Sequence, residues 1–247
     1  MLKQEKAVAL EQADREKTAR LAQMQASADE LQAAVRHRTA ELARANLQLS
    51  ARERELQHAA FHDPLTDLAN RRYLIERVDQ AMSDSRRRDE SLVLMLIDLD
   101  HFKPINDRYG HDAGDLLLHT LAQRLREQVR AHDLVARLGG DEFAVLICGP
   151  EAHRHARDIA LRLLAELALP VPYDEHLLGI SVSIGAALFP LHAEQFAGLY
   201  KAADEALYRA KQRGRSGFVM QGDEVPAEAP AAPLDVLRVR SGLADPD

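Results

Sequence analysis

A seven-residue apolar repeat runs through the first quarter of the chain. Residues from about 2 to 60 contain neither Gly nor Pro and are rich in residues that favour helices. One stripe of the repeat is apolar throughout and consists of Leu21, Ala28, Val35, Leu42, Leu49 and Leu56. A second stripe, three residues further on, is interrupted by Arg38 and Arg52. The pattern predicts a coiled coil with the same helix of a second copy, and the alternative is a single helix folded back on the rest of the chain.

Shorter apolar runs follow the Asp63-Pro64 step, where the proline ends the helical segment. Continuous or alternating apolar residues predict strands at 91–100, 134–138, 142–148 and 180–189. Helical spacing of apolar residues predicts helices at 71–85, 114–130, 153–168 and 195–214. Asn70 is the expected N-cap of the first of these helices. Gly139-Gly140 separates two of the strands and predicts a β-hairpin turn.

The pattern divides the chain into three parts. Residues 1–62 form the helical part, residues 63–221 a globular α/β domain, and residues 222–247 a tail. The tail is rich in Pro, Ala and Asp, a composition that cannot bury an apolar core, so we expect it to be disordered.

The composition limits the class of protein. The formal net charge of −7 gives no support for a broad nucleic-acid-binding surface, so no nucleic-acid partner is expected. The single cysteine, Cys148, excludes a disulfide within the chain and favours a reducing compartment. No apolar run approaches the ~18 residues of a membrane span, so we expect a cytoplasmic chain. This leaves open that the chain is the cytoplasmic part of a larger membrane-bound sensor.

Acidic side chains end two of the predicted strands: Asp98 and Asp100 close the first, and the hairpin turn carries Asp141 and Glu142. If these strands are neighbours in one sheet, Asp98 comes close to Asp141. Carboxylates in such a position can hold Mg²⁺ beside a triphosphate, and like charges this close repel each other without a cation. The simpler alternative is that the acids of the turn only face water.

Basic and amide side chains add candidate ligands for a nucleotide. Lys103 follows the first acidic strand, where a turn would aim backbone N–H groups outward as an anion site. Asn106 and Asp115 together can read the edge of a guanine, although Asn is common in turns and Asp115 could cap a helix. Lys211 and Arg215 are four residues apart on the last predicted helix, so they share a face that could bind phosphate or only complement the helix dipole.

Five motifs in a fixed order connect the globular region to a known family. They are DPLTDLANRR, IDLDHFKPINDRYGHDAGD, RAHDLVARLGGDEF, SVSIGA and DEALYRAKQRGR, and they lie between about Asp63 and Gly217. This region resembles the GGDEF domain of diguanylate cyclases. The resemblance implies a nucleotidyl-cyclase or palm-like α/β fold, in which helices flank a central, mostly antiparallel sheet that follows an N-terminal coiled coil.

The resemblance also implies an activity. Diguanylate cyclases join two GTP molecules into cyclic di-GMP, release two pyrophosphates, and use two Mg²⁺ ions per active site, with Mn²⁺ as a substitute. Each domain supplies half of the geometry, so a homodimer through the N-terminal coiled coil is expected. The product is expected to inhibit the enzyme through an RxxD site. The alternative is a catalytically silent module that binds GTP or cyclic di-GMP, which the intact motif argues against.

The motifs transfer roles to individual residues of this chain. Metal binding is implied for Asp98, the backbone carbonyl of Leu99, Asp141 and Glu142. The implied catalytic residues are Asp141 or Glu142 as proton acceptor and Lys103 as a stabiliser of the leaving phosphates. GTP binding is implied for Asn106 and Asp115 at the guanine, for His101, Phe102, Lys103, Lys211 and Arg215 at the triphosphate, and for Gly139 and Gly140, which leave the backbone open to the nucleotide. Arg130 and Asp133 match the RxxD inhibitory motif.

Overall fold

A computed structural model of the chain describes residues 2–223, so residues 224–247 of the expected tail lie outside the described residues. The chain divides into two compact units, Met1–Ala60 and Phe61–Asp247. Helix α1 (Leu2–Phe61) is continuous over 60 residues. The long N-terminal helix expected from the sequence is therefore confirmed.

The apolar stripe of α1 is exposed along the helix. Leu21, Leu42 and Leu56 are 55%, 60% and 70% exposed. A polar helix with exposed leucines gains little stability from its own packing, so it requires a partner surface. Pairing of this stripe in a coiled coil stays a prediction.

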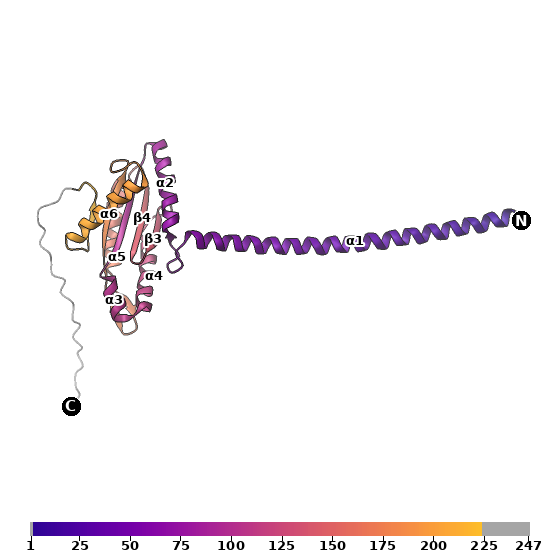
Figure 1. The fold of residues 1–247 in the computed structure, drawn as a ribbon, viewed down its shortest axis with the longest axis horizontal. Helices are drawn as coiled ribbons and strands as arrows, with labels where there is room; N and C mark the ends of the chain where they lie inside the picture. The colour runs from indigo at the N-terminus through magenta and orange to yellow at the C-terminus, as the bar shows by residue number, and fades with distance from the viewer. Residues whose placement is uncertain (1, 224–247) are drawn as a thin grey trace, which may run out of the picture. The chain divides into compact units, whose positions relative to one another are not determined.

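The second unit is built on a six-stranded mixed sheet (Figure 1). The strand order is β1-β3-β4-β2-β7-β8, and three of the five neighbouring pairs are antiparallel. These strands are β1 (Ala69–Asn70), β2 (Ser91–Asp100), β3 (Leu134–Gly139), β4 (Glu142–Gly149), β7 (Ser181–Phe189) and β8 (Phe218–Met220). A separate hairpin consists of β5 (Val171–Tyr173) and β6 (His176–Leu178). The expected α/β fold with a mostly antiparallel central sheet is confirmed.

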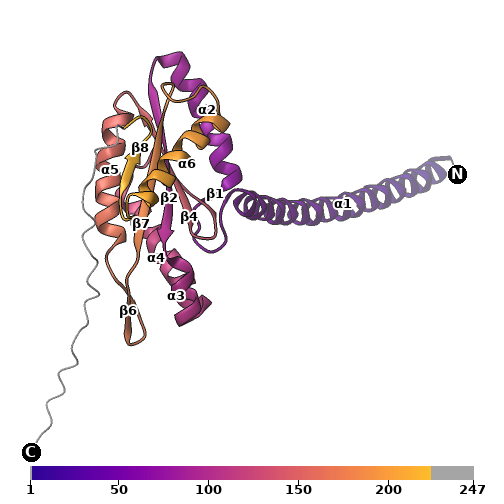
Figure 2. The ribbon, with the colours of Figure 1, turned by 60° about the vertical axis from the view of Figure 1, so that its left-hand side comes forward.

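Helices cover both faces of this sheet (Figure 2). The first face carries α2 (Arg71–Arg88) and α6 (Phe196–Gln212), the second carries α4 (His111–Gln128) and α5 (Ala152–Leu167), and the short α3 (Phe102–Tyr109) precedes α4. Side chains of β2 alternate between the faces, with Leu94 and Leu96 packed towards α2 and α6, and Met95 and Ile97 towards α4 and α5. Burial on both faces explains why β2 is a continuous apolar run rather than an alternating one.

The structure contains short elements that the sequence pattern does not predict. Strands β1, β5, β6 and β8 have two or three residues each, which is too short to show a periodicity. Helix α4 begins at His111, three residues before the predicted start at Gly114. Asn70 caps α2 as expected, because its side chain accepts a hydrogen bond from the N–H of Tyr73 at 3.0 Å.

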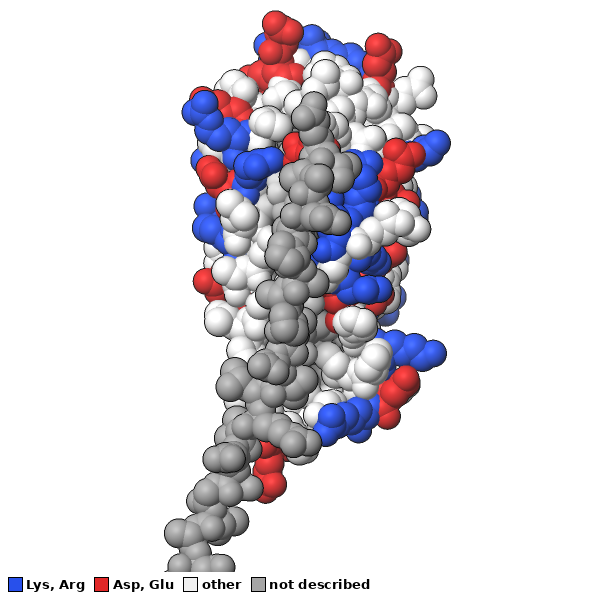
Figure 3. Space-filling model, turned by 90° about the vertical axis from the view of Figure 1, so that its left-hand side faces the viewer, with Lys and Arg blue, Asp and Glu red and all other residues white. Residues whose placement is uncertain are grey.

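Charged side chains are spread among uncharged ones on one face of the second unit (Figure 3). Acidic and basic groups are intermixed on the face that Figure 3 shows, in keeping with the modest net charge of −7. Among the helices of residues 2–223, none combines the length and the apolar character that crossing a membrane requires.

Candidate active site

The sheet register brings the acidic ends of β2 and β4 together. These strands run antiparallel, and Asp98 lies directly opposite Glu142. The N–H of Leu99 donates to the backbone carbonyl of Asp141 at 3.3 Å, so the ladder continues into the hairpin turn. Three of the acids singled out in the sequence therefore form one cluster at one end of the sheet.

Burial and mutual repulsion raise the pKa of two of these carboxyl groups. Burial is the main cause for Asp98, and the charges of Asp141 and Asp100 add to it. Lys211 opposes this shift, because its Nζ lies 2.8 Å from Oδ2 of Asp98. The pKa of Glu142 is raised by burial and then by Asp98 and Asp141. The cluster is therefore electrostatically unfavourable by itself and favours a bound cation.

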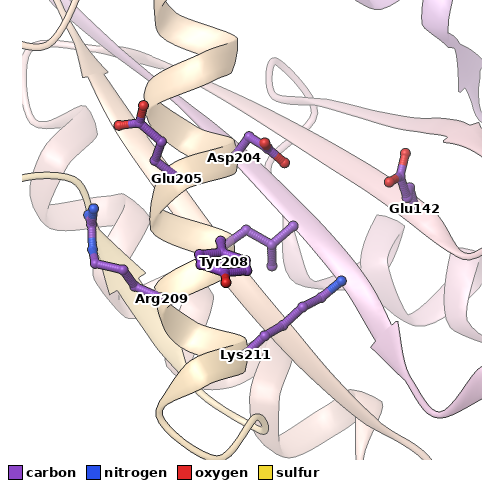
Figure 4. Close-up of a pocket in the computed structure, with 7 residues that line it drawn as sticks. Glu142, Asp204, Glu205, Tyr208, Arg209 and Lys211 are labelled. Carbon is purple, nitrogen blue, oxygen red and sulfur yellow. The ribbon is translucent and has the colours of Figure 1, made fainter.

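A cavity of about 410 Å³ gives access to this cluster from the side of α6. Figure 4 shows Glu142 of β4 on one side, with Asp204 and Lys211 pointing towards it from α6. Tyr208 lines the same cavity and is 62% exposed. The cavity therefore lies open to solvent beside the acidic cluster.

Lys211 and Arg215 do not share one face of the last helix, so that prediction is wrong. The helix α6 ends before Arg215, because Gly214 and Arg215 adopt positive φ values of 103° and 66°. Arg215 instead lies in the following turn, with its Nε 3.9 Å from Oδ1 of Asp100. Both cations still reach the end of β2, Lys211 through Asp98 and Arg215 through Asp100.

Asp100 is a positioning residue that the sequence pattern did not assign. It is only 4% exposed, and its carboxylate accepts hydrogen bonds from the hydroxyls of Ser181 and Ser183, both at 2.8 Å. It also accepts from the N–H of Ser216 at 3.1 Å, which ties the turn carrying Arg215 to the sheet. The sequence did contain an indication of this role. Asp100 lies two residues after Asp98 in β2, which places both carboxylates on the same face of the strand.

The two candidate guanine ligands lie on consecutive helices, Asn106 on α3 and Asp115 on α4. Oδ1 of Asn106 is buried and has no hydrogen-bond partner among the described residues. It occupies the space beside Gly114, where a Cβ would come within 1.9 Å of it. An unpaired buried oxygen of this kind requires a donor, which a ligand can supply. Asp115 is exposed inside α4 rather than at its start, so the alternative that it caps the helix is wrong.

The predicted turn after β2 is a single residue followed by a helix. His101 has a φ of 60°, and α3 begins at Phe102. The side chain of His101 makes no capping hydrogen bond to α3. The first N–H groups of a helix that lack such a cap can bind an anion, as the predicted turn was expected to do. Phe102 is 9% exposed, whereas Lys103 faces solvent.

The hairpin tip depends on glycine for its backbone conformation. Gly139 and Gly140 have φ values of 137° and 54°, which side-chain-bearing residues rarely adopt. A Cβ at either position would meet no atom within 4 Å, so space beside the tip is open. The expectation that a nucleotide approaches the backbone here stays a prediction.

Arg137 joins this tip to the start of the domain. Its Nε and Nη2 donate to the carbonyl of Gly140 at 3.1 and 2.9 Å, and its Nη1 donates to both carboxylate oxygens of Asp63 at 2.9 and 3.1 Å. The side chains of Arg137 and Asp63 are only 11% and 16% exposed. Burial alone would raise the pKa of Asp63, but hydrogen bonds from Thr66 and Arg137 lower it below the ordinary value of 3.8. One guanidinium therefore fixes the hairpin tip and the domain start together.

The two residues of the RxxD motif form a closed turn. The N–H of Arg130 donates to Oδ2 of Asp133, and the N–H of Asp133 donates to the carbonyl of Arg130, both at 3.0 Å. The side chain of Asp133 is 1% exposed, and its Oδ1 has no hydrogen-bond partner among residues 2–223. This turn lies near Gly149, the last residue of β4, whereas Glu142 is the first residue of that strand. Arg130 and Gly149 line the same cavity.

The acidic cluster has the chemistry of a magnesium site without forming a closed cage. In the described part of the chain, no group of three or more His, Cys, Asp or Glu side chains is arranged to hold a metal ion. Mg²⁺ needs only one or two protein carboxylates, because it keeps several waters and takes phosphate oxygens as further ligands. Asp98 and Glu142, whose raised pKa values reflect burial and neighbouring charge, fit such a cation.

Comparison with known proteins gives the family. Residues 60–217 match the model of the family described as diguanylate cyclase, GGDEF domain. The chain belongs to this family. The bifunctional diguanylate cyclase/cyclic di-GMP phosphodiesterase MucR of Pseudomonas aeruginosa is 44% identical over 177 residues, covering 72% of this chain and 25% of MucR. Diguanylate cyclase TpbB of the same species is 40% identical over 189 residues, covering 72% of this chain and 43% of TpbB, so the chain spans less than half of either relative.

Solved structures show the same GGDEF fold. The GGDEF domain of TpbB is 42% identical with a TM-score of 0.63, covering 65% of this chain and 94% of that one. The coiled coil and GGDEF domain of DgcB from Caulobacter crescentus, in complex with c-di-GMP, is 27% identical with a TM-score of 0.67. That match covers 77% of this chain and 98% of the DgcB chain. The predicted family resemblance is confirmed, and residues Gly139–Phe143 are called the GGDEF hairpin below.

We predict that Arg137→Ala destabilises the domain by about 2 kcal/mol at neutral pH, because it leaves a partly buried Asp63 with fewer charge-assisted hydrogen bonds. Urea unfolding measures this loss. The lowered pKa of Asp63 contributes stability above the unfolded pKa near 3.8, and this is lost as the pH falls through the folded pKa. The difference between the two proteins should therefore shrink below about pH 3.8.

Arg157→Ala is the matched control for this experiment. Arg157 pairs with Asp223 at 3.1 Å, but these side chains are 55% and 34% exposed. An exposed pair of this kind contributes about 0–1 kcal/mol. We call the contacts of Arg137 with Asp63 and Gly140 the Arg137 clamp. If Arg137→Ala lowers the free energy of unfolding no more than Arg157→Ala does, the Arg137 clamp does not stabilise the hairpin.

A second prediction concerns Glu142→Gln, which should raise the melting temperature at pH 7. A raised carboxyl pKa means that the unfolded state ionises first, so stability falls as the pH rises from about 4.5 through the folded pKa. Removing the charge removes that penalty, and the gain should vanish below pH 4.5. Differential scanning calorimetry without divalent cations measures the effect. Glu205→Gln, on the other side of the same cavity, should give no gain, and an equal gain would contradict the repulsion argument.

Proposed function

We propose that this chain is a diguanylate cyclase, which condenses two GTP molecules into cyclic di-GMP and releases two pyrophosphates. The observation that carries the proposal is the pairing of Asp98 with Glu142 beside Asp141, at the tip of the GGDEF hairpin. Membership of the family and the curated relatives named diguanylate cyclase support it. The presence of every acid and glycine of the motif argues against a catalytically silent receptor.

GTP binding is proposed for the residues that surround the acidic cluster. The unpaired amide oxygen of Asn106 supports its assignment to the guanine edge, with Asp115 as the carboxylate partner. Lys103, Lys211 and Arg215 supply positive charge for the triphosphate. The uncapped start of α3 at His101 and Phe102 adds backbone donors for the same phosphates.

Members of this family depend on a divalent metal ion, and we propose two Mg²⁺ ions, with Mn²⁺ as a substitute. Asp98, the carbonyl of Leu99, Asp141 and Glu142 would hold them. Bound Mg²⁺ neutralises phosphate charge and lowers the pKa of a coordinated hydroxyl. A cation in this position would also compete for the carboxylate that Lys211 now pairs with, and this would release Lys211 for a phosphate oxygen.

The residues of the chain perform the remaining chemistry. Asp141 or Glu142 accepts the proton of the attacking 3′-hydroxyl, and the raised pKa of Glu142, caused first by burial, suits a general base. Lys103 stabilises the negative charge that develops on the leaving pyrophosphate. The turn held by Asp100 keeps Arg215 beside the same phosphates.

One domain offers half of the geometry that the reaction needs. The 3′-hydroxyl of one GTP must meet the α-phosphorus of another, so two GGDEF hairpins must face each other. A parallel coiled coil through the exposed stripe of α1 would place two domains at high effective concentration. The DgcB structure contains a coiled coil together with a GGDEF domain, which supports a homodimer of this kind.

Product inhibition is proposed for the turn of Arg130 and Asp133. Oδ1 of Asp133 is buried, has no hydrogen-bond partner among residues 2–223 and lies 3.7 Å from Nε2 of His132, so it can accept from a guanine N–H group. The guanidinium of Arg130 can donate to phosphate or guanine oxygens. The lone cysteine excludes an internal disulfide, which supports a cytoplasmic site for this reaction.

Incubation with GTP and Mg²⁺ tests the activity. We expect cyclic di-GMP from the unmutated chain by mass spectrometry, and a loss of at least about 100-fold in rate for Asp141→Ala, because a charge at the reacting centre is removed. Asp79→Ala, which changes an exposed acid on α2, should keep the full rate. No dinucleotide from the unmutated chain, after bound cyclic di-GMP has been stripped from it, would favour the receptor function.

Arg130→Ala tests the inhibition. The substitution removes donors for the ligand, so half-inhibition should need roughly 10-fold more cyclic di-GMP, while the initial rate without product stays unchanged. A dose–response assay of initial rates measures both quantities. Unchanged sensitivity to the product would exclude this turn as the inhibitory site.

A further inference from the structure

A second cavity, of about 660 Å³, lies at the end of β4 that is opposite Glu142, between α2 and the start of α5. Its volume is within the range of ligand pockets, roughly 300–1,000 Å³. The charged and titratable side chains that line it are Arg77, Arg88, Arg130, His132, His155, Asp84, Glu90 and Glu151. Cys148 also lines it, and burial raises the pKa of its thiol to about 11, so this part of the wall is uncharged. The cavity therefore combines mixed charge with a neutral wall.

Both the backbone and the guanidinium of Arg130, which lines this cavity, make contacts that hold them in place. Its backbone is fixed by the turn with Asp133. Its guanidinium meets the ring of His155, with Nη1 3.3 Å from Nδ1 and Nη2 3.1 Å from Nε2. His155 lies in the first turn of α5, where its N–H donates to the carbonyl of Glu151 at 3.0 Å. The ring is 28% exposed, so the contact lies partly inside the protein.

We propose that His155 is a positioning residue of the inhibitory site, which holds the Arg130 guanidinium towards this cavity for an anionic guanine nucleotide such as cyclic di-GMP. The inference rests on the proposed inhibitory role of Arg130 and Asp133. It adds a residue from α5 that lies outside the RxxD motif, 25 positions along the chain from Arg130.

The chemistry of the two side chains suits this role. A neutral imidazole has one acceptor nitrogen, so at most one of the two contacts is a hydrogen bond, and the other is a close approach between ring and guanidinium. A guanidinium has five N–H donors, so most of them stay available for phosphate or guanine oxygens. Arg has many rotamers, and a contact that fixes one of them before binding reduces the entropy lost on binding.

Binding of cyclic di-GMP to the full chain, measured by isothermal titration calorimetry after removal of bound product, tests the proposal. His155→Ala should weaken binding by roughly 10-fold and raise the half-inhibitory concentration by the same factor, with an unchanged initial rate. His155→Gln should restore most of the affinity, because its amide oxygen can accept from the guanidinium. A purely structural role would instead change the initial rate and the melting temperature.

His153→Ala is the matched control, because His153 is exposed on the same helix two residues earlier. It should bind the product as the unmutated chain does. If His155→Ala binds normally while Arg130→Ala does not, the positioning role is wrong and the inhibitory site stands. If the unmutated chain binds no cyclic di-GMP, the inhibitory site and the positioning role both fail, whereas cyclase activity is judged by its own assay.

Discussion

The carboxylates of Asp98 and Glu142 repel each other because the register of β2 and β4 places these two residues directly opposite each other. That register is fixed by folding, because Leu94 and Leu96 pack in one apolar cluster and Met95 and Ile97 in the other, and a slip of one residue would disrupt the close packing of both. The hydrophobic core therefore holds these acids and Asp141 together although their charges oppose it. A site that stores such repulsion has a built-in preference for cations, and this preference is what a triphosphate with its metal ions would satisfy.

The residues around the cluster divide into those that balance its charge and those that hold others in place. Lys211 balances charge, since its ammonium group pairs with Asp98. Asp100 holds other residues in place, because its buried carboxylate accepts hydrogen bonds from two serine hydroxyls and from the N–H of Ser216. Two acids separated by one residue on the same strand face thus do different work. The more exposed carboxylate, that of Asp98, is available to a ligand, and the buried one fixes the turn that carries Arg215.

The sequence predicts the long strands and helices well, because their apolar residues recur with a clear period or form continuous runs. It also predicts the cluster of Asp98 and Asp141, because Asp98 lies near the end of one apolar strand and Asp141 lies in the turn next to another. The predicted helix of 195–214 already ends before Arg215, so the expectation that Arg215 shares a helix face with Lys211 did not agree with that boundary, and the positive φ values of Gly214 and Arg215 bear the boundary out. Contacts such as Arg137 with Asp63 span 74 residues, and periodicity carries no information about partners so far apart. The short strands cannot be predicted in this way either, because they contain too few residues to show a pattern.

Arg137 connects the segment that begins at Asp63, DPLT, with the GGDEF hairpin. The same guanidinium binds the carbonyl of Gly140 at the hairpin tip and the carboxylate of Asp63, two residues after α1 ends at Phe61. A planar guanidinium that donates to two acceptors fixes direction as well as distance. A change in the path of the chain between Phe61 and Asp63 would therefore reach the hairpin tip through Arg137. The guanidinium of Arg137 therefore fixes the hairpin tip relative to the first residues of its own domain.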